Sequence, residues 1–180
     1  MYLTVKQQLK HLQNKLTESE VRALREAIDI YDSNIHTGSE IVDTVLYQKD
    51  LLARSNNIQF TWMCDGSAVT FMEPSRLYAL LSNAENAIEA VMPLPESKRV
   101  ILLHIRRENS DAVIETTNYF DASIPAERGT SKQDKTHHGF GIKSMRFIAE
   151  DYSGSISTSQ TGNMFFLTVR LPIRKIAAKE

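Results

Sequence analysis

The stretch of residues 77–91 reads L-Y-A-L-L-S-N-A-E-N-A-I-E-A-V. Its apolar residues recur every three or four positions, which is the period of an amphipathic helix. When that apolar side faces a core, Ser82, Asn86 and Glu89 share another side, with Asn83 adjoining. Mg²⁺ takes oxygen ligands and usually keeps water, so this side can hold the ion against phosphates. A solvated polar face is the alternative interpretation of this segment alone.

A second informative stretch, residues 136–144, reads T-H-H-G-F-G-I-K-S and predicts a helix that starts at a glycine-rich turn. Gly139 and Gly141 let the backbone approach a phosphate, and the helix behind them directs N–H groups and its positive dipole at the anion. Phe140 and Ile142 can anchor the turn to the core. Glycines at a helix start are also common without a ligand. No G-x-x-x-x-G-K-S/T stretch occurs, so a P-loop is excluded.

The segments around these two stretches predict an α+β fold, a two-layer α/β sandwich with helices on one face of a mixed sheet. The polar segment 119–137 lacks periodicity and is longer than an ordinary connection, which is typical of a lid. The expected helices are 39–55 with Ser39 as cap, 75–91 with Ser75 as cap, and 139–150; the expected strands are 58–64, 99–106, 112–118, 154–160 and 165–171.

Core positions follow from the same patterns. Cys64 is expected to be a buried strand residue, because free cysteine is usually buried. The helix after Ser39 is expected to pack a broad apolar face on the sheet, formed by Ile41, Val42, Val45, Leu46, Leu51 and Leu52.

The N-terminal segment, residues 1–36, predicts a helical hairpin. A capping box at residues 17–20 separates two narrow apolar stripes, which are typical of paired helices. Pairing with a second copy of the chain and packing against its own domain both remain open. The two stripes are Val5, Leu9, Leu12 and Leu16, then Val21, Leu24, Ile28, Tyr31 and Ile35.

Composition excludes several classes of protein. Lys and Arg total 21 against 22 acidic residues, so no basic excess favours nucleic acid as a partner. A single cysteine excludes an internal disulfide framework and suits a reducing compartment. The N-terminus has no signal-peptide pattern, and no apolar run approaches the ~20 residues that span a bilayer. We therefore expect a soluble domain.

The order of these motifs resembles the GHKL ATPases, and most closely the sensor histidine kinases of the peptide-pheromone, quorum-sensing type. The resemblance covers about residues 37–172 and implies a GHKL ATP-binding catalytic domain (residues 37–175) after a remnant of the dimerisation and phosphoacceptor region (residues 1–36). The matching stretches are Thr37-Gly38-Ser39 with Asp43 and Lys49, residues 80–90, Thr117-Asn118, Thr130-Ser131-Lys132, residues 138–144, and Gly154 with residues 165–172.

The resemblance implies a role for each matching residue. Asn86 would be the Mg²⁺ ligand and, with Glu85 and Ser82, part of the catalytic set. Asn118 stands where most of the superfamily has an adenine-contacting Asp, and an Asn carbonyl can still accept from the adenine amino group. The residues that would hold Mg·ATP are Asn83, Asn86, Asn118, Lys132, His138, Gly139, Phe140, Gly141 and Ile142.

The resemblance also implies ATP and Mg²⁺ as cofactors and γ-phosphoryl transfer to a histidine. The partners would be a response regulator and a second copy of the chain, joined through the N-terminal helices. The domain would be cytoplasmic, and only segments of the parent protein would contact the bacterial membrane. His11 lacks the following acidic residue of a phosphoacceptor box and is interpreted as a surface or seam residue. The acceptor would then lie upstream, and this chain would be inactive alone.

One departure from the family pattern opens alternatives. The usual N-x-x-D-N has become Asn83-Ala84-Glu85-Asn86, one residue short. Either Ser82 stands in the place of the family's first Asn, which the unbroken apolar phase through Ile88 favours, or the helix compensates. A hydroxyl is a poorer polar partner there, which puts catalytic efficiency in doubt more than binding. A nucleotide-binding GHKL signalling module without kinase activity is one alternative. An anti-sigma-type protein serine kinase is another, against which the N-terminal hairpin argues.

Overall fold

The computed structural model describes residues 35–82, 85–121 and 140–173, together with Thr17, Ser19 and Arg22. The chain divides into two compact units, Met1–Ile35 and His36–Glu180. The expected helical hairpin and lid lie almost wholly outside the described residues, so both stay predictions. No helix in the described part is long and apolar enough to cross a membrane.

The second unit follows the predicted order of elements, with strand ends that differ slightly from the expected ones. Two short 3₁₀ helices, η1 and η2, were not predicted. Along the chain the elements are α3 (Glu40–Ser55), β1 (Gln59–Cys64), η1 (Gly66–Val69), α4 (Pro74–Ser82), α5 (Glu85–Val91), η2 (Glu96–Lys98), β2 (Val100–Glu108), β3 (Asp111–Tyr119), α6 (Phe140–Asp151), β4 (Ser155–Thr161) and β5 (Met164–Pro172).

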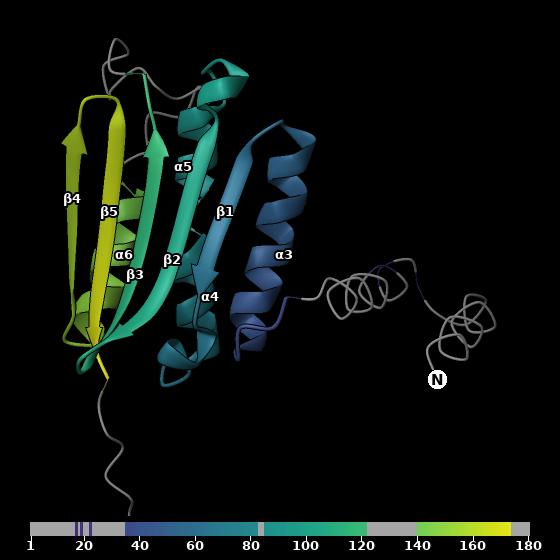
Figure 1. Ribbon diagram of the computed structural model, residues 1–180. Coiled ribbons are helices and arrows are strands. Elements are labelled where there is room, and N and C mark those ends of the chain that lie inside the picture. Colours follow the sequence, from purple (N-terminus) through teal and green to yellow (C-terminus); the bar gives the residue numbers. More distant parts are fainter. Residues whose placement is uncertain are drawn as a thin grey trace, which may run out of the picture. The chain divides into compact units, whose positions relative to one another are not determined.

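The five strands form one mixed sheet in the order β1-β2-β3-β5-β4. β1 and β2 are parallel, and the other neighbouring pairs are antiparallel. Helices α3 to α6 cover one face of this sheet (Figure 1). Residues that pair directly across strands point to the same face of the sheet. Ile101, Ile105 and Val169 are buried on the face that the helices cover, so the core lies between this face and the helices. The predicted two-layer α+β sandwich is confirmed.

Helix α3 confirms its predicted start but not its whole predicted core face. The side chain of Ser39 caps the helix by accepting from the N–H of Val42. Leu51 and Leu52 were expected in the core, but they are 51% and 40% exposed. The buried residues of α3 recur at helical spacing through Lys49 and Ala53 and form one stripe. Positions 51 and 52 lie outside this stripe and therefore face solvent.

The expected helix after Pro74 corresponds to the helices α4 and α5, and residues 83 and 84 between them lie outside the described residues. Ser75 was expected to cap it and instead lies inside α4. The carboxylate of Glu73 accepts from the hydroxyl and N–H of Ser75 and from the N–H of Arg76. These hydrogen bonds, that of the Ser75 hydroxyl first, lower the pKa of Glu73. An acidic side chain placed before a proline at the first helical position serves the same purpose as the expected serine.

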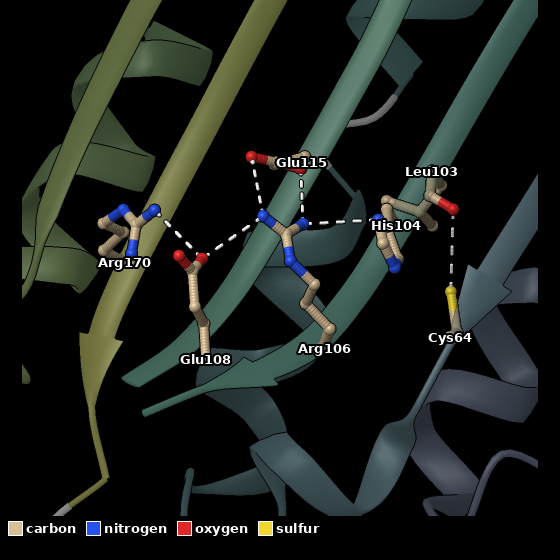
Figure 2. Close-up of polar contacts among 7 residues, drawn as sticks. All are labelled: Cys64, Leu103, His104, Arg106, Glu108, Glu115 and Arg170. Carbon is tan, nitrogen blue, oxygen red and sulfur yellow. Dashed lines mark hydrogen bonds and ion pairs between the residues drawn. The ribbon is translucent and has the colours of Figure 1, made fainter. Parts of the chain in front are cut away.

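The face of the sheet opposite the helices carries a network of charged side chains, drawn in Figure 2. The guanidinium of Arg106 on β2 pairs with both carboxylate oxygens of Glu115 on β3 and also contacts Glu108. Arg170 on β5 reaches the same Glu108 at 3.0 Å. Arg106 and Arg170 are the cross-strand neighbours of Val113, which is fully buried on this otherwise open face. The network therefore covers an apolar side chain with charge.

Cys64 is the last residue of β1 and is half-buried rather than fully in the core. Its sulfur contacts the carbonyl oxygen of Leu103, as Figure 2 shows. Burial raises the pKa of the Cys64 thiol to about 12. The thiol therefore stays protonated at neutral pH, which agrees with the expected structural role.

Candidate functional site

Asn118 is a buried polar side chain near the end of β3, 4% exposed. It pairs with Ile101 on β2 and Phe165 on β5, so it lies on the helix-covered face of the sheet. Its amide nitrogen donates to the carbonyl oxygen of Tyr119 at 2.8 Å. This hydrogen bond uses one of the two N–H groups and orients the amide, and the side-chain oxygen is the atom that can accept from a ligand.

Helix α5 packs over the part of the sheet that holds Asn118. Its buried side chains Ala87, Ile88 and Val91 form one apolar cluster with Ile101, the direct cross-strand partner of Asn118. The helix contacts both β2 and β3. Asn86 precedes Ala87 and is exposed. The apolar residues thus fix the helix on the sheet while the amide of Asn86 remains accessible.

The first residues of α6 lie toward the same end of the sheet. The chain turns from the last residue of α6 directly into β4 at Ser155, which is the end of β4 remote from Asn118. The helix packs along β4 and β5 on the same face as α5 (Figure 1). Twelve residues at about 1.5 Å each carry it back toward the Tyr119 end. Gly141 and Ile142, in the first turn, are half-buried there.

Helices α4 and α6 are joined by polar and aromatic contacts. The N–H of Glu73 donates to the hydroxyl of Tyr152 at 2.9 Å. Arg76 pairs with Asp151 at 3.3 Å, and its guanidinium carbon lies 5.7 Å from the centre of the Phe147 ring. These contacts fix the beginning of α4 against the end of α6. Ser82, half-buried, is the last residue of α4.

Several residues of the predicted site cannot be placed. Asn83, Lys132, His138 and Gly139 lie outside the described residues. Glu85 and Phe140 are the first residues of α5 and α6. Of the predicted set, the structure therefore brings toward one end of the sheet the helix of Asn86, the strand of Asn118 and the helix start of Gly141.

The types of donor atom at the site indicate which metal ion it could hold. Among the described residues, no group of three His, Cys, Asp or Glu side chains could hold a metal ion. Asn86 offers one amide oxygen, so phosphate oxygens and water would supply the other ligands. Such a donor set fits Mg²⁺, which is usually bound by few protein oxygens together with phosphates and water.

One feature of the site was not predicted from the sequence. The carbonyl of Tyr119 orients the Asn118 amide. Because every residue has a backbone carbonyl, this contact cannot be predicted from residue types. The available signal was the amide residue itself near the end of the strand.

Comparison with known proteins agrees with this geometry. The family model described as "GHKL domain" matches residues 72–172, more than half of the chain. No curated protein matches the chain in sequence.

Among solved structures, three nucleotide-free crystal forms of the catalytic domain of histidine kinase ThkA are similar to this chain. Their identities are 20%, 19% and 20%, and their TM-scores are 0.52, 0.54 and 0.54. The matches cover 74%, 76% and 74% of this chain and 91%, 93% and 92% of the ThkA chains. At this identity the likeness concerns the fold. On the family match and the fold together, the chain belongs to the GHKL domain family.

Proposed function

We propose that the chain is the ATP-binding catalytic domain of a sensor histidine kinase in a two-component system. It would transfer the γ-phosphoryl group of Mg·ATP to a histidine on an upstream segment of its parent protein. The observation that carries the proposal is the convergence of α5, the end of β3 and the start of α6 toward one end of the sheet. Phosphoryl transfer depends on positioning and charge neutralisation, and such an arrangement can supply both.

Each element would have one task. The oxygen of Asn118 would accept from the adenine amino group, and the amide of Asn86 would bind Mg²⁺, with Glu85 and Ser82 beside it. The N–H groups at the start of α6, around Gly141, would face the phosphates together with Lys132, His138 and Gly139. Phe140 and Ile142 would anchor that turn, and Asn83 would adjoin the ligand.

The partners of the proposed kinase follow from its chemistry. A response regulator would receive the phosphoryl group from the histidine. The first unit would pair with a second copy of the chain, and any membrane contact would come from other segments of the parent protein. The kinase would belong to the subfamily that responds to peptide pheromones.

A second function is favoured by one residue. Ser82 stands where the resembling kinases carry an Asn, and a hydroxyl offers fewer hydrogen bonds than an amide. A GHKL module that binds nucleotide without phosphorylating a partner would tolerate this change.

Calorimetry with ATP, in Mg²⁺ and in a chelator, tests the nucleotide site. We expect Asn86→Ala to abolish the Mg²⁺-dependent part of the affinity, because it removes the one amide oxygen assigned to the ion. Asn109→Gly is the matched control: Asn109 lies in the β2–β3 turn, at the other end of the sheet, in a left-handed conformation that glycine adopts readily. Unchanged Mg²⁺ dependence in Asn86→Ala would contradict the metal assignment.

Transfer is tested by adding γ-labelled ATP to the chain extended by the histidine-bearing segment of its parent. A kinase produces acid-labile, alkali-stable phosphohistidine. If the chain binds ATP tightly but the protein acquires no label, the result supports the alternative of a nucleotide-binding module without kinase activity. An acid-stable label would indicate phosphorylation of a hydroxyl.

A further inference from the structure

Thr116 on β3 is a half-buried polar residue whose nearest neighbours in the sheet are all buried. It lies two residues before Asn118, and side chains two apart along a strand point to the same face of the sheet. This is the face that the helices cover. The four nearest positions on it, two on the same strand and two on the adjacent strands, are Ile114, Asn118, Leu103 and Leu167, which are 3%, 4%, 3% and 8% exposed. The helix layer therefore leaves Thr116 accessible although it covers the residues around it.

The place of Thr116 in the sheet accounts for this exposure. Helix α5 packs on β2 and β3, and helix α6 packs on β4 and β5. Thr116 pairs with Leu167 where β3 meets β5, so it lies at the boundary between the parts of the sheet that the two helices cover. Asn86 and Gly141 belong to these same two helices. Thr116 is thus accessible from the side on which the proposed nucleotide would lie.

The hydroxyl of Thr116 is available to a ligand. Among the described residues, none donates a hydrogen bond to this hydroxyl or accepts one from it. In the same part of the chain, every fully buried side-chain oxygen has a hydrogen-bond partner, so an unpaired hydroxyl there is open to solvent. A threonine hydroxyl can donate one hydrogen bond and accept others.

We propose that the Thr116 hydroxyl donates a hydrogen bond to ring nitrogen 1 of an adenine whose amino group donates to the Asn118 oxygen. The inference rests on the proposed function, because it needs an adenine at Asn118. In adenine, the amino group at position 6 lies beside ring nitrogen 1, which is an acceptor. Positions 116 and 118 are about 6.6 Å apart along the strand, a separation that the edge of one purine can bridge. Thr116 would then be a second residue that determines specificity for the base.

Calorimetry of the full chain with ATP and 1-deaza-ATP tests this contact. In 1-deaza-ATP a C–H group replaces ring nitrogen 1, so the analogue keeps the amino group for Asn118 and offers no acceptor to the Thr116 hydroxyl. We expect the parent chain to bind the analogue roughly three- to tenfold more weakly than ATP, as for the loss of one hydrogen bond. 7-Deaza-ATP, which is altered away from that edge of the base, is the control nucleotide. Its affinity relative to ATP should be the same in the parent and in every variant.

Three variants assign the effect to the hydroxyl. Thr116→Val removes the hydroxyl and keeps a β-branched side chain that suits a strand, and it should bind ATP and 1-deaza-ATP equally. Thr116→Ser keeps a hydroxyl and should retain most of the preference for ATP. Thr168→Val is the matched control, because Thr168 is half-buried on β5 but pairs with Glu115 and so lies on the opposite face. This control should keep the full preference of the parent.

Three results would overturn the inference while leaving the nucleotide site intact. In the first, the parent chain binds ATP and 1-deaza-ATP equally, a comparison that holds even if Thr116→Val does not fold. In the second, thermal melting shows that Thr116→Val is folded, and it keeps the preference of the parent. In the third, Thr168→Val loses the preference to the same extent as Thr116→Val. A parent chain that binds no ATP would instead overturn the proposed nucleotide site, and this inference with it.

Discussion

At the scale of single residues, Asn118 carries the most specific claim about the ligand. Its nitrogen is held by the Tyr119 carbonyl, so its oxygen can accept from a purine that bears an amino group at position 6. A purine with a carbonyl at that position would place two acceptors together. The geometry therefore favours adenine over hypoxanthine.

We expect the parent chain to bind ATP more tightly than ITP, and Asn118→Leu to lose most of this preference. An unpaired polar group in a buried site costs about 1–3 kcal/mol, which sets the expected size of the discrimination. Calorimetry with both nucleotides measures it. Thr117→Val is the control, because neighbouring strand residues point to opposite faces of the sheet. Equal affinity of the parent for ATP and ITP would show that Asn118 does not read the base.

At the residue scale, the identity of the site residues could be predicted from the sequence, but their contacts could not. Asn118 and Asn86 were predicted as site residues from their types and order. The orientation of the Asn118 amide depends on a backbone carbonyl, which any residue at position 119 would supply. The stretch Thr37-Gly38-Ser39 was visible as a motif, but Gly66, whose N–H donates to the Thr37 carbonyl, is distant in sequence and comes next to Thr37 only when β1 is in place.

At the scale of elements, the charged network on the open face of the sheet makes folding sensitive to acid. The side-chain hydrogen bond from Arg106 lowers the pKa of Glu115 below its ordinary value of 4.5. The native state therefore binds fewer protons than the unfolded state near that pH. The resulting stabilisation is fully present above pH 4.5 and is lost as the pH falls through the lowered pKa of the folded protein.

We expect Glu115→Gln to lower the melting temperature at pH 7 and to lose this effect well below pH 4.5, where the parent carboxylate is protonated too. The contribution should be small, below about 1 kcal/mol, because both partners are partly exposed. Thermal melting across this pH range measures it. Glu150→Gln, an exposed acid on α6, is the control. A destabilisation that is the same at both pH values would rule out the charge pairing as its cause.

The elements themselves were predictable wherever one period dominated. The stripe through Leu77, Leu80 and Leu81 gave the helix, and the polar turn at residues 108–111 gave the β2–β3 hairpin. The errors have physical causes. Leu51 and Leu52 are apolar but lie outside the buried stripe of α3. Glu73 caps α4, although serine is the residue type that more often caps a helix. The pairing of Arg106 with Glu115 depends on a strand register that the sequence pattern does not specify.

At the scale of the whole molecule, three separate elements would contribute to one ligand site. α5, the end of β3 and the start of α6 come from distant parts of the sequence, and only the sheet order β1-β2-β3-β5-β4 brings them toward one end. The family match covers all three elements. One nucleotide should therefore affect all three at once.

A nuclear magnetic resonance titration of the isotope-labelled chain with Mg·ATP tests whether these three elements bind one nucleotide. We predict that the backbone amide signals of Asn86, Asn118 and Gly141 shift together and saturate at one dissociation constant. The signal of Asn109, in the turn at the other end of the sheet, should stay in place. Signals that move at different nucleotide concentrations, or shifts confined to the Asn109 end, would contradict a single nucleotide site.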